Sequence, residues 1–304
     1  MFTPLSGRVV GSLVAEGKVQ SGARAVELGA QTYSVNAKSI RFIQNKLTKA
    51  GKQPIATALE RFSTITPARK PRDPAPHMEE FFTALGFSSY TAIDISDYGK
   101  TVIMDLNEDV REKYAFTETY DLVTNIGVSE HLINQYIFFK NAHMLTAPGG
   151  YMVHIVPSVH YANHGFFNYQ PRFFLDLAAA NEYEIIDLFL GDREERVLEL
   201  MRPTSTGVYF YPHVPALSGD PNGNLLVVAV LRKKNSAPFR TPLQGKYVPD
   251  VTHTEDQNLY QMPDAVVKVA TKGYFYAGVP DVSVRLKQKA LRVLRAIERL
   301  VLKM

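Results

Sequence analysis

Short apolar runs that alternate with helix-like segments constrain the fold of this 304-residue chain more than any other feature. Parallel strands buried on both faces read as continuous apolar stretches, joined by helices that cross the sheet. Seven such runs occur in order: Arg24–Leu28, Tyr90–Ile95, Thr101–Leu106, Tyr120–Ile126, Tyr151–Val156, Glu184–Leu190 and Asn224–Arg232. They predict an α/β protein with a doubly wound, mostly parallel seven-stranded sheet. We expect the last two strands to pair antiparallel, because residues 191–223 show no crossover helix.

Helical patterns occupy most gaps between these runs. The predicted crossover helices are His77–Leu85, Ser129–Leu145 with Ser129 as N-cap, and Pro171–Asn181. Residues 32–76 form an insertion after the first strand. It holds helices at Ala37–Ala50 and Pro54–Arg61 and then a Pro-rich stretch, and we interpret it as a lid or mobile flap.

Positive charge is concentrated at the C-terminal end. Residues 281–304 hold seven Lys or Arg against two Asp or Glu, so the rest of a chain with net charge +4 sums to −1. We therefore expect no nucleic-acid-binding surface. Residues 283–304 read as a basic amphipathic helix that docks on its own domain or a partner, with peripheral membrane contact as the alternative. We divide the chain into a domain at 1–235 and an irregular extension at 236–304 that ends in this helix.

The chain has no cysteine, which excludes disulfides, thiolate zinc sites and a cysteine nucleophile. No apolar run reaches the roughly 20 residues that span a bilayer. Residues 1–17 are too interrupted for a signal peptide. These features favour a cytoplasmic protein.

Polar residues end four successive predicted strands. Glu27 precedes a turn at Gly29, and Asp94 and Asp105 end the next two strands, before Asn125 and Gly127 at the end of the fourth. Ligands of open α/β sheets bind where the carboxyl ends of the strands meet. A carboxylate at that edge suits the two hydroxyl donors of a ribose.

These strand ends, in this order, resemble those of class I S-adenosylmethionine (SAM)-dependent methyltransferases. The resemblance covers roughly residues 22–232 and extends to Tyr120–Val123 and to the Leu145–Gly150 turn. It implies a Rossmann-like methyltransferase fold with S-adenosyl-L-methionine as cofactor. The cofactor-binding residues that it implies are Glu27, Gly29, Gln31, Asp94, Asp105, Leu106, Asn125 and Gly127.

The sequence departs from the family pattern after the first strand. Only Gly29 is present where the family shows two or three glycines, and Glu27 and Asp94 are 67 positions apart. We interpret His77–Leu85 as the usual crossover helix and residues 32–76 as the insertion that lengthens the gap.

Histidines and aromatic residues follow the fourth and fifth strands, whose carboxyl ends reach the same edge. We predict His131 or His164 as the catalytic general base. We predict Glu130, Phe166 and Tyr169 as substrate contacts. His154 lies within a strand and is typical of a core histidine. The spacing of Glu130, His131, His160 and His164 matches no strong ligand pattern, so we predict no metal site.

The predicted function is methyl transfer from SAM to a small-molecule acceptor, such as a sugar, lipid or secondary-metabolite intermediate, by in-line displacement. One alternative is a non-catalytic methyltransferase-like binding module that has lost the cofactor. Another is a nicotinamide-dependent oxidoreductase, which would require a Gly-x-Gly-x-x-Gly turn that this chain lacks.

Overall fold

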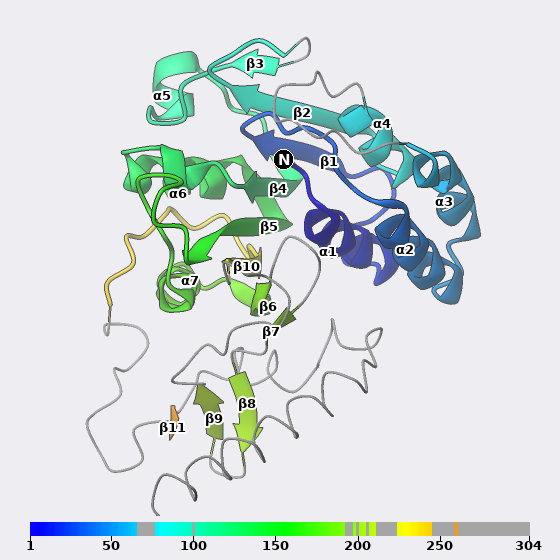
Figure 1. Cartoon of the computed structure of the whole chain (residues 1–304). Coiled ribbons are helices and arrows are strands. Elements are labelled where there is room, and N and C mark those ends of the chain that lie inside the picture. The colour runs from blue at the N-terminus through cyan, green and yellow to red at the C-terminus, as the bar shows by residue number, and fades with distance from the viewer. Residues whose placement is uncertain are drawn as a thin grey trace, which may run out of the picture. The chain divides into compact units, whose positions relative to one another are not determined.

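A computed structural model describes residues 1–65, 77–98, 101–191, 197–198, 201–204, 207–210, 224–244 and 259–260. Within these residues one eight-stranded sheet has the order β3-β2-β1-β4-β5-β10-β6-β7 (Figure 1). Its strands are β1 (Arg24–Leu28), β2 (Ser89–Asp94), β3 (Thr101–Ile103), β4 (Tyr120–Ile126), β5 (Thr146–Val159), β6 (Glu184–Gly191), β7 (Val197–Leu198) and β10 (Leu225–Arg232). A separate three-stranded sheet joins β8 (Met201–Thr204), β9 (Gly207–Phe210) and β11 (Leu259–Tyr260).

The strand directions confirm the doubly wound prediction. β1 pairs parallel with both β2 and β4, and β4 pairs parallel with β5. β10 runs antiparallel between β5 and β6, as expected because the sequence of residues 191–223 shows no crossover-helix pattern. The seven predicted strands are all present, and the two-residue edge strand β7 adds an eighth that the sequence did not predict.

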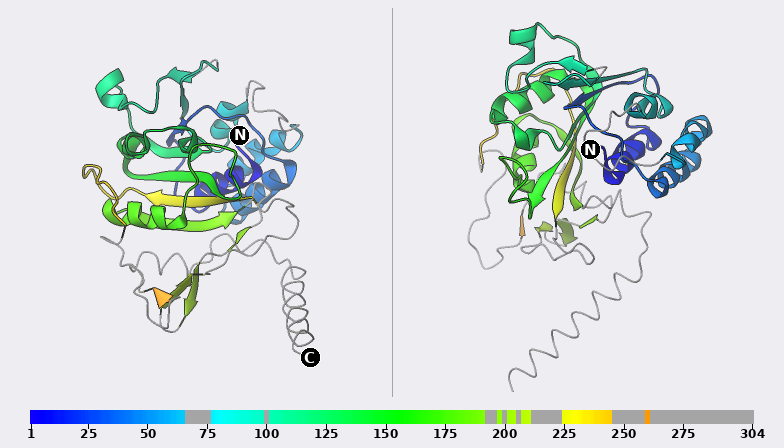
Figure 2. Two further views of the ribbon diagram at one scale, coloured as in Figure 1. Left: turned by 60° about the vertical axis from the view of Figure 1, so that its left-hand side comes forward. Right: turned by 45° about the horizontal axis from the view of Figure 1, so that its top comes forward.

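Helices lie on both faces of the sheet (Figures 1 and 2). One side carries α1 (Pro4–Ala15), α2 (Ala37–Lys49), α3 (Gln53–Ala58), the 3₁₀ turn η1 (Glu60–Ser63) and α4 (His77–Ala84). The other side carries α6 (Gln135–Leu145) and α7 (Pro171–Ala180), and α5 (Val110–Tyr114) follows β3. A second 3₁₀ turn, η2 (Ser129–His131), lies between β4 and α6.

Helix α1 was missed in the sequence. Every residue from Leu5 to Ala15 is buried, so the segment lacks the apolar–polar period that reveals a surface helix. Its start does carry a local signal, because the Thr3 side chain accepts a hydrogen bond from the Ser6 amide and Pro4 follows directly.

Two glycines of α1 allow it to lie close to α2 and to the segment just before α2. A Cβ atom on Gly7 would lie 2.9 Å from Val35 Cγ2, and one on Gly11 would lie 2.6 Å from Ile43 Cγ2. Ile43 is fully buried. Helix α2, although part of the predicted insertion, is thus packed into the helical layer that covers one face of the sheet.

Each face of the sheet has its own aromatic core. On the α1–α4 side, Phe81 contacts Phe2, Tyr33 and Phe62 at ring-centroid distances of 5.5–5.7 Å. On the opposite side, the Phe139 ring lies 4.8 Å from that of Phe173. Burial of such rings, about 25 cal/mol per Å² of apolar surface, is the main term that holds the helices to the sheet.

The predicted helix Ser129–Leu145 is wrong in its first turn. The chain forms the short turn η2 and then begins α6 at Gln135, with the Asn134 side chain as the N-cap that accepts from the Ile137 amide. The Ser129 hydroxyl does not cap a helix, because it accepts a hydrogen bond from the Asn125 side chain instead.

Some predictions fall outside the described residues. The basic helix at 283–304 and nearly all of the Pro-rich stretch are among these, so the lid and membrane-contact interpretations stay predictions. Among the described residues, no helix combines the length and apolar character that crossing a bilayer requires.

The contact of Gly11 with Ile43 gives a stability prediction. Gly11→Ala should lower the free energy of unfolding by about 1–3 kcal/mol because the new methyl group overpacks against Ile43. Helix propensity alone would raise it by about 1 kcal/mol. Urea denaturation of the two proteins measures the difference.

Ile43→Ala provides the matched background. In that variant the added methyl group enters the space vacated by Ile43, so Gly11→Ala should be neutral or stabilising there. If Gly11→Ala stabilises the wild-type protein as much as it stabilises the Ile43→Ala variant, the close packing is contradicted.

Candidate active site

Glu27 lies in β1 with its carboxylate fully buried. Its Oε2 accepts hydrogen bonds from the Tyr90 hydroxyl at 2.5 Å and from the Gln31 amide at 3.1 Å. Its Oε1 has no hydrogen-bond partner among the described residues. Burial raises the pKa of Glu27 to about 7, although the Tyr90 hydrogen bond opposes the shift. A buried carboxylate with one open acceptor atom is suited to a ligand that donates hydrogen bonds.

Gly29 makes the turn after β1. Its φ of +81° lies in the left-handed region, and a Cβ atom would lie 2.4 Å from Val128 Cγ2. Ala30 and Gln31 keep ordinary negative φ values. A single glycine therefore satisfies the steric demand of this turn, which accounts for the sparse glycines in the sequence.

Asp94 connects the end of β2 to that turn. Its Oδ2 accepts from the Ala30 amide at 2.9 Å, and its Oδ1 accepts from the Ser96 amide at 3.0 Å. Next to it, the Ile95 side chain is 68% exposed. The carboxylate thus lies at the predicted edge, but here it binds backbone amides, and its role toward a ribose stays a prediction.

The residues after β3 form a compact turn. Asp105 Oδ1 accepts from the backbone amide and the side-chain amide of Asn107 at 2.9 and 3.0 Å. The Asp105 amide donates to the Tyr114 hydroxyl, and the Leu106 side chain is buried. The predicted contact of Asp105 and Leu106 with an adenine stays a prediction.

Asn125 is engaged inside the protein at the end of β4. Its Oδ1 accepts from the Ser129 amide, and its Nδ2 donates to Ser129 Oγ at 2.9 Å and lies 3.2 Å from His154 Nδ1. Both side chains are buried, and burial lowers the pKa of His154 to about 3. His154 is therefore a neutral core histidine, and Asn125 holds the turn that leads to Glu130.

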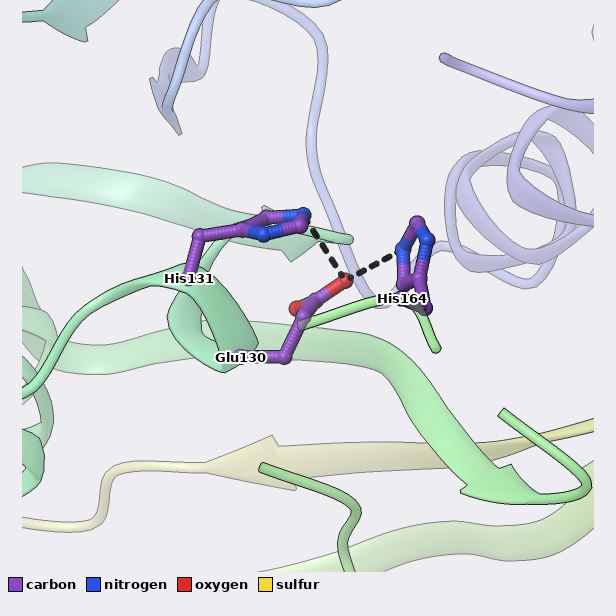
Figure 3. A group of neighbouring side chains, drawn as sticks. All are labelled: Glu130, His131 and His164. Atoms are coloured by element: carbon purple, nitrogen blue, oxygen red, sulfur yellow. Dashed lines mark ion pairs between the residues drawn. The ribbon is translucent and has the colours of Figure 1, made fainter. Parts of the chain in front are cut away.

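Glu130, His131 and His164 come together at the ends of β4 and β5 (Figure 3). Glu130 Oε1 lies 3.8 Å from His131 Nε2 and 3.4 Å from His164 Nε2. The two rings are 5.0 Å apart in an edge-to-face arrangement. Glu130 is fully buried, whereas the histidine side chains are 47% and 36% exposed. Burial lowers the pKa of His131. The predicted convergence of the two loops is thus present.

Backbone contacts fix this arrangement, which we call the Glu130 cluster. The Phe166 and Phe167 amides donate to the Glu130 carbonyl, at 2.7 and 3.2 Å. A Cβ atom on Gly165 would lie 2.8 Å from that same oxygen, and one on Gly127 would lie 3.3 Å from Glu130 Oε1. Gly127 has a left-handed φ of +68°. The two glycines let the loops close around the carboxylate.

The two aromatic residues predicted to contact substrate lie in different surroundings. Phe166 is 71% exposed beside the Glu130 cluster, where an acceptor could cover it. Tyr169 is buried, its ring packs against Phe139 and Phe173, and its hydroxyl donates to Gln135 Oε1 at 2.5 Å. Tyr169 therefore supports the site from within the core.

Three residues of the site were missed in the sequence. Tyr90 holds Glu27, Gln135 Nε2 donates to the Ser129 and Leu132 carbonyls, and Gly165 leaves room for Glu130. Only Tyr90 had a usable signal. Ala92 of β2 pairs with Glu27 of β1. Tyr90 precedes Ala92 by two residues, so the side chains of Tyr90 and Ala92 project from the same face of β2, beside Glu27.

The raised pKa of Glu27 gives a pH prediction. Between the ordinary value of 4.5 and about 7, the folded protein keeps a proton that the unfolded chain has lost. The free energy of unfolding should therefore fall as pH rises through this window, by about 3 kcal/mol at most, and then level off. Glu27→Gln carries no such proton, so its stability relative to wild type should increase from about pH 4.5 to about pH 7.

Chemical denaturation of both proteins across that range measures the difference. A constant difference between wild type and Glu27→Gln would show that Glu27 titrates normally in the folded protein.

The family comparison agrees with this geometry. Residues 74–210 match a protein-family model that is described as "Methyltransferase domain". The match runs from α4 to β9, and it includes Asp94 and the whole Glu130 cluster. Among curated proteins, none matches the sequence significantly.

The solved structures to which this chain is similar share little sequence identity with it. A 1,6-didemethyltoxoflavin-N1-methyltransferase of Burkholderia thailandensis is 11% identical, with 76% of this chain and 80% of that chain covered at a TM-score of 0.38. A putative methyltransferase of Bacillus halodurans is also 11% identical, with 75% and 99% covered at 0.39. TehB of Haemophilus influenzae is 13% identical, with 74% and 62% covered at 0.38, so this chain spans less than two thirds of it.

Scores this low carry no argument about substrate or mechanism. The family model and the strand order β3-β2-β1-β4-β5-β10-β6 agree with each other and with the order of the strand-end residues. Residues 74–210 of the chain thus carry a methyltransferase domain.

Proposed function

We propose that this protein binds S-adenosylmethionine at the carboxyl ends of β1–β4 and methylates a small molecule that lies against the Glu130 cluster. One observation supports this proposal above the others. The loops after β4 and β5 converge on a buried carboxylate flanked by two histidines, at the same sheet edge as Glu27 and Asp94. Cofactor residues and acceptor residues thus share one edge, as in-line transfer requires.

Glu27 fits the amino-acid part of this cofactor. Its open Oε1 can accept a hydrogen bond from the ammonium group, and the negative charge stabilises that cation. The opposite charge should in turn lower the pKa of Glu27 from its raised value, so that binding near neutral pH releases a proton.

Asp94 fits the ribose. Two hydroxyl donors need two acceptor oxygens, and the Asp94 carboxylate provides both at the end of β2. The Ala30 and Ser96 amides that now bind Asp94 orient this carboxylate. Exposed Ile95 follows immediately and offers an apolar surface to the nucleoside.

When bound, S-adenosylmethionine supplies an electrophilic methyl group on a sulfonium. The protein must then hold the acceptor atom in line with that methyl group and exclude water. Phe166 and Ile133, exposed by 71% and 70%, flank the Glu130 cluster in sequence and suit an acceptor with an apolar portion. We infer a sugar, lipid or secondary-metabolite intermediate that combines such a portion with a nucleophilic oxygen or nitrogen.

An acceptor of that kind loses a proton during transfer. His131 and His164 remain our predicted catalytic residues, because both imidazoles border the place where the acceptor would lie. Either ring can accept the proton at Nε2 only while the lone pair of that nitrogen is not bound to a proton or another ligand.

Two alternatives make different predictions about ligands. A nicotinamide-dependent oxidoreductase would bind NAD or NADP, although this turn has only Gly29 with a left-handed φ. A non-catalytic binding module would bind neither these nucleotides nor the methyl donor. Calorimetric titration with S-adenosylmethionine, S-adenosylhomocysteine and NAD distinguishes the three hypotheses.

The decisive variant is Asp94→Ala. Loss of two charge-assisted hydrogen bonds to the ribose should weaken S-adenosylhomocysteine binding about 10- to 100-fold. Asp94→Asn keeps one acceptor oxygen and should show an intermediate loss. Calorimetry measures both dissociation constants.

Glu118→Ala is the matched control, since it removes an exposed carboxylate whose partner, Arg24, lies at the opposite end of β1. It should leave affinity unchanged. Melting temperatures identify any variant that has simply lost the turn near Ala30. Equal affinity of Asp94→Ala and wild type would overturn the proposed cofactor site.

A further inference from the structure

The Glu130 cluster has the composition of a metal centre. Its three ligand atoms, one carboxylate oxygen and two imidazole nitrogens, all lie within 4.8 Å of one another (Figure 3). Two histidines and one carboxylate, with further positions open, form a donor set that binds Zn²⁺ and other divalent transition metals. Sequence spacing hid this set, because His164 comes from a different loop than Glu130 and His131.

The two separations that involve the Glu130 carboxylate are close to those that such an ion requires. Bonds of about 2.0–2.1 Å in a tetrahedral site place neighbouring ligand atoms about 3.4 Å apart. Glu130 Oε1 lies 3.4 Å from His164 Nε2 and 3.8 Å from His131 Nε2. Small rotations of the two partly exposed histidine side chains would complete the geometry.

The protein holds this carboxylate in place before any ion binds. The backbone of Glu130 is fixed by the amides of the loop that carries His164, and Gly165 lets this loop lie against it. The carboxylate is fully buried while both imidazoles reach solvent.

We propose that Glu130, His131 and His164 bind a divalent transition-metal cation, with Zn²⁺ as the reference ion. At least one coordination position then faces solvent on the side of exposed Phe166. In the ion-bound protein both histidines are ligands and not bases. The open position would hold an oxygen or nitrogen of the acceptor and favour loss of its proton to solvent water. That last role rests on the proposed function, whereas ion binding itself does not.

The test uses the full chain without a histidine tag, treated with a chelator and dialysed into metal-free buffer. Titration with Zn²⁺, followed by calorimetry, should show one ion per chain with a dissociation constant at or below about 1 μM. Co²⁺ should give the visible absorption of a four-coordinate complex with nitrogen and oxygen ligands.

Substitutions identify the ligands. Glu130→Gln, His131→Ala and His164→Ala should each weaken Zn²⁺ binding at least about 10-fold. His160→Ala is the matched control, because His160 lies in the same loop as His164 but outside the cluster, and it should leave binding unchanged. The exposed His131 and His164 variants keep the test informative if Glu130→Gln fails to fold.

The outcomes separate this inference from the proposed function. Asp94→Ala should still bind one Zn²⁺, since Asp94 is not part of the cluster. Absence of stoichiometric binding, or binding that is equally strong in the His131→Ala and His164→Ala variants, would overturn the metal site. Loss of S-adenosylhomocysteine binding with Zn²⁺ binding intact would overturn only the cofactor proposal.

Discussion

The parallel pairing of β1 with both β2 and β4 is the constraint on which the site depends. This pairing places Leu28 opposite Ile93 on one side and opposite Asn125 on the other. The next residues along each strand must then leave the sheet at one edge, whatever their identity. Glu27 and Glu130 are more than 100 positions apart in the sequence, yet the strand pairing brings Glu27, Asp94 and the Glu130 cluster to one edge of the sheet.

The carboxylates at this edge differ in how their charge is compensated. Glu27 is buried with a tyrosine hydroxyl and one backbone amide, and its pKa rises to about 7. Asp94 accepts two backbone amides, and Glu130 lies between two imidazoles. We proposed a different partner for each on this basis, namely an ammonium group for Glu27, the ribose hydroxyls for Asp94 and a metal cation for Glu130. Three acidic side chains at one edge are suited to ligands that carry hydrogen-bond donors or positive charge.

Much of this architecture could be predicted from the sequence, because strands buried on both faces give continuous apolar runs. The antiparallel pairing of the last two predicted strands was also predicted correctly, because the sequence between them shows no crossover-helix pattern. Helix α1 could not be found by its period, since its whole surface is buried. The start of α6 was misjudged because Ser129 binds Asn125, a contact that depends on the turn at Gly127. Tyr169 was expected to contact substrate, yet its ring completes the core beside Phe139.

In the candidate site, too, some residues could be predicted from the sequence and others could not. Residues on strand ends were identified because their order along the chain determines their place on the sheet. The residues that hold them in place, Tyr90, Gln135 and Gly165, were not identified. Their contacts are with residues distant in the sequence or in irregular turns, and such contacts leave no periodic pattern in the sequence. The possibility of a metal centre was rejected on spacing, although spacing has little meaning for ligands that different loops contribute.

A crystal structure of the protein with S-adenosylhomocysteine tests the central claim most directly. The account predicts the ribose hydroxyls within hydrogen-bond distance of the Asp94 carboxylate, the ammonium group at Glu27 Oε1 and the sulfur atom facing the Glu130 cluster. A nucleoside bound elsewhere, with Asp94 still bonded only to the Ala30 and Ser96 amides, would contradict it.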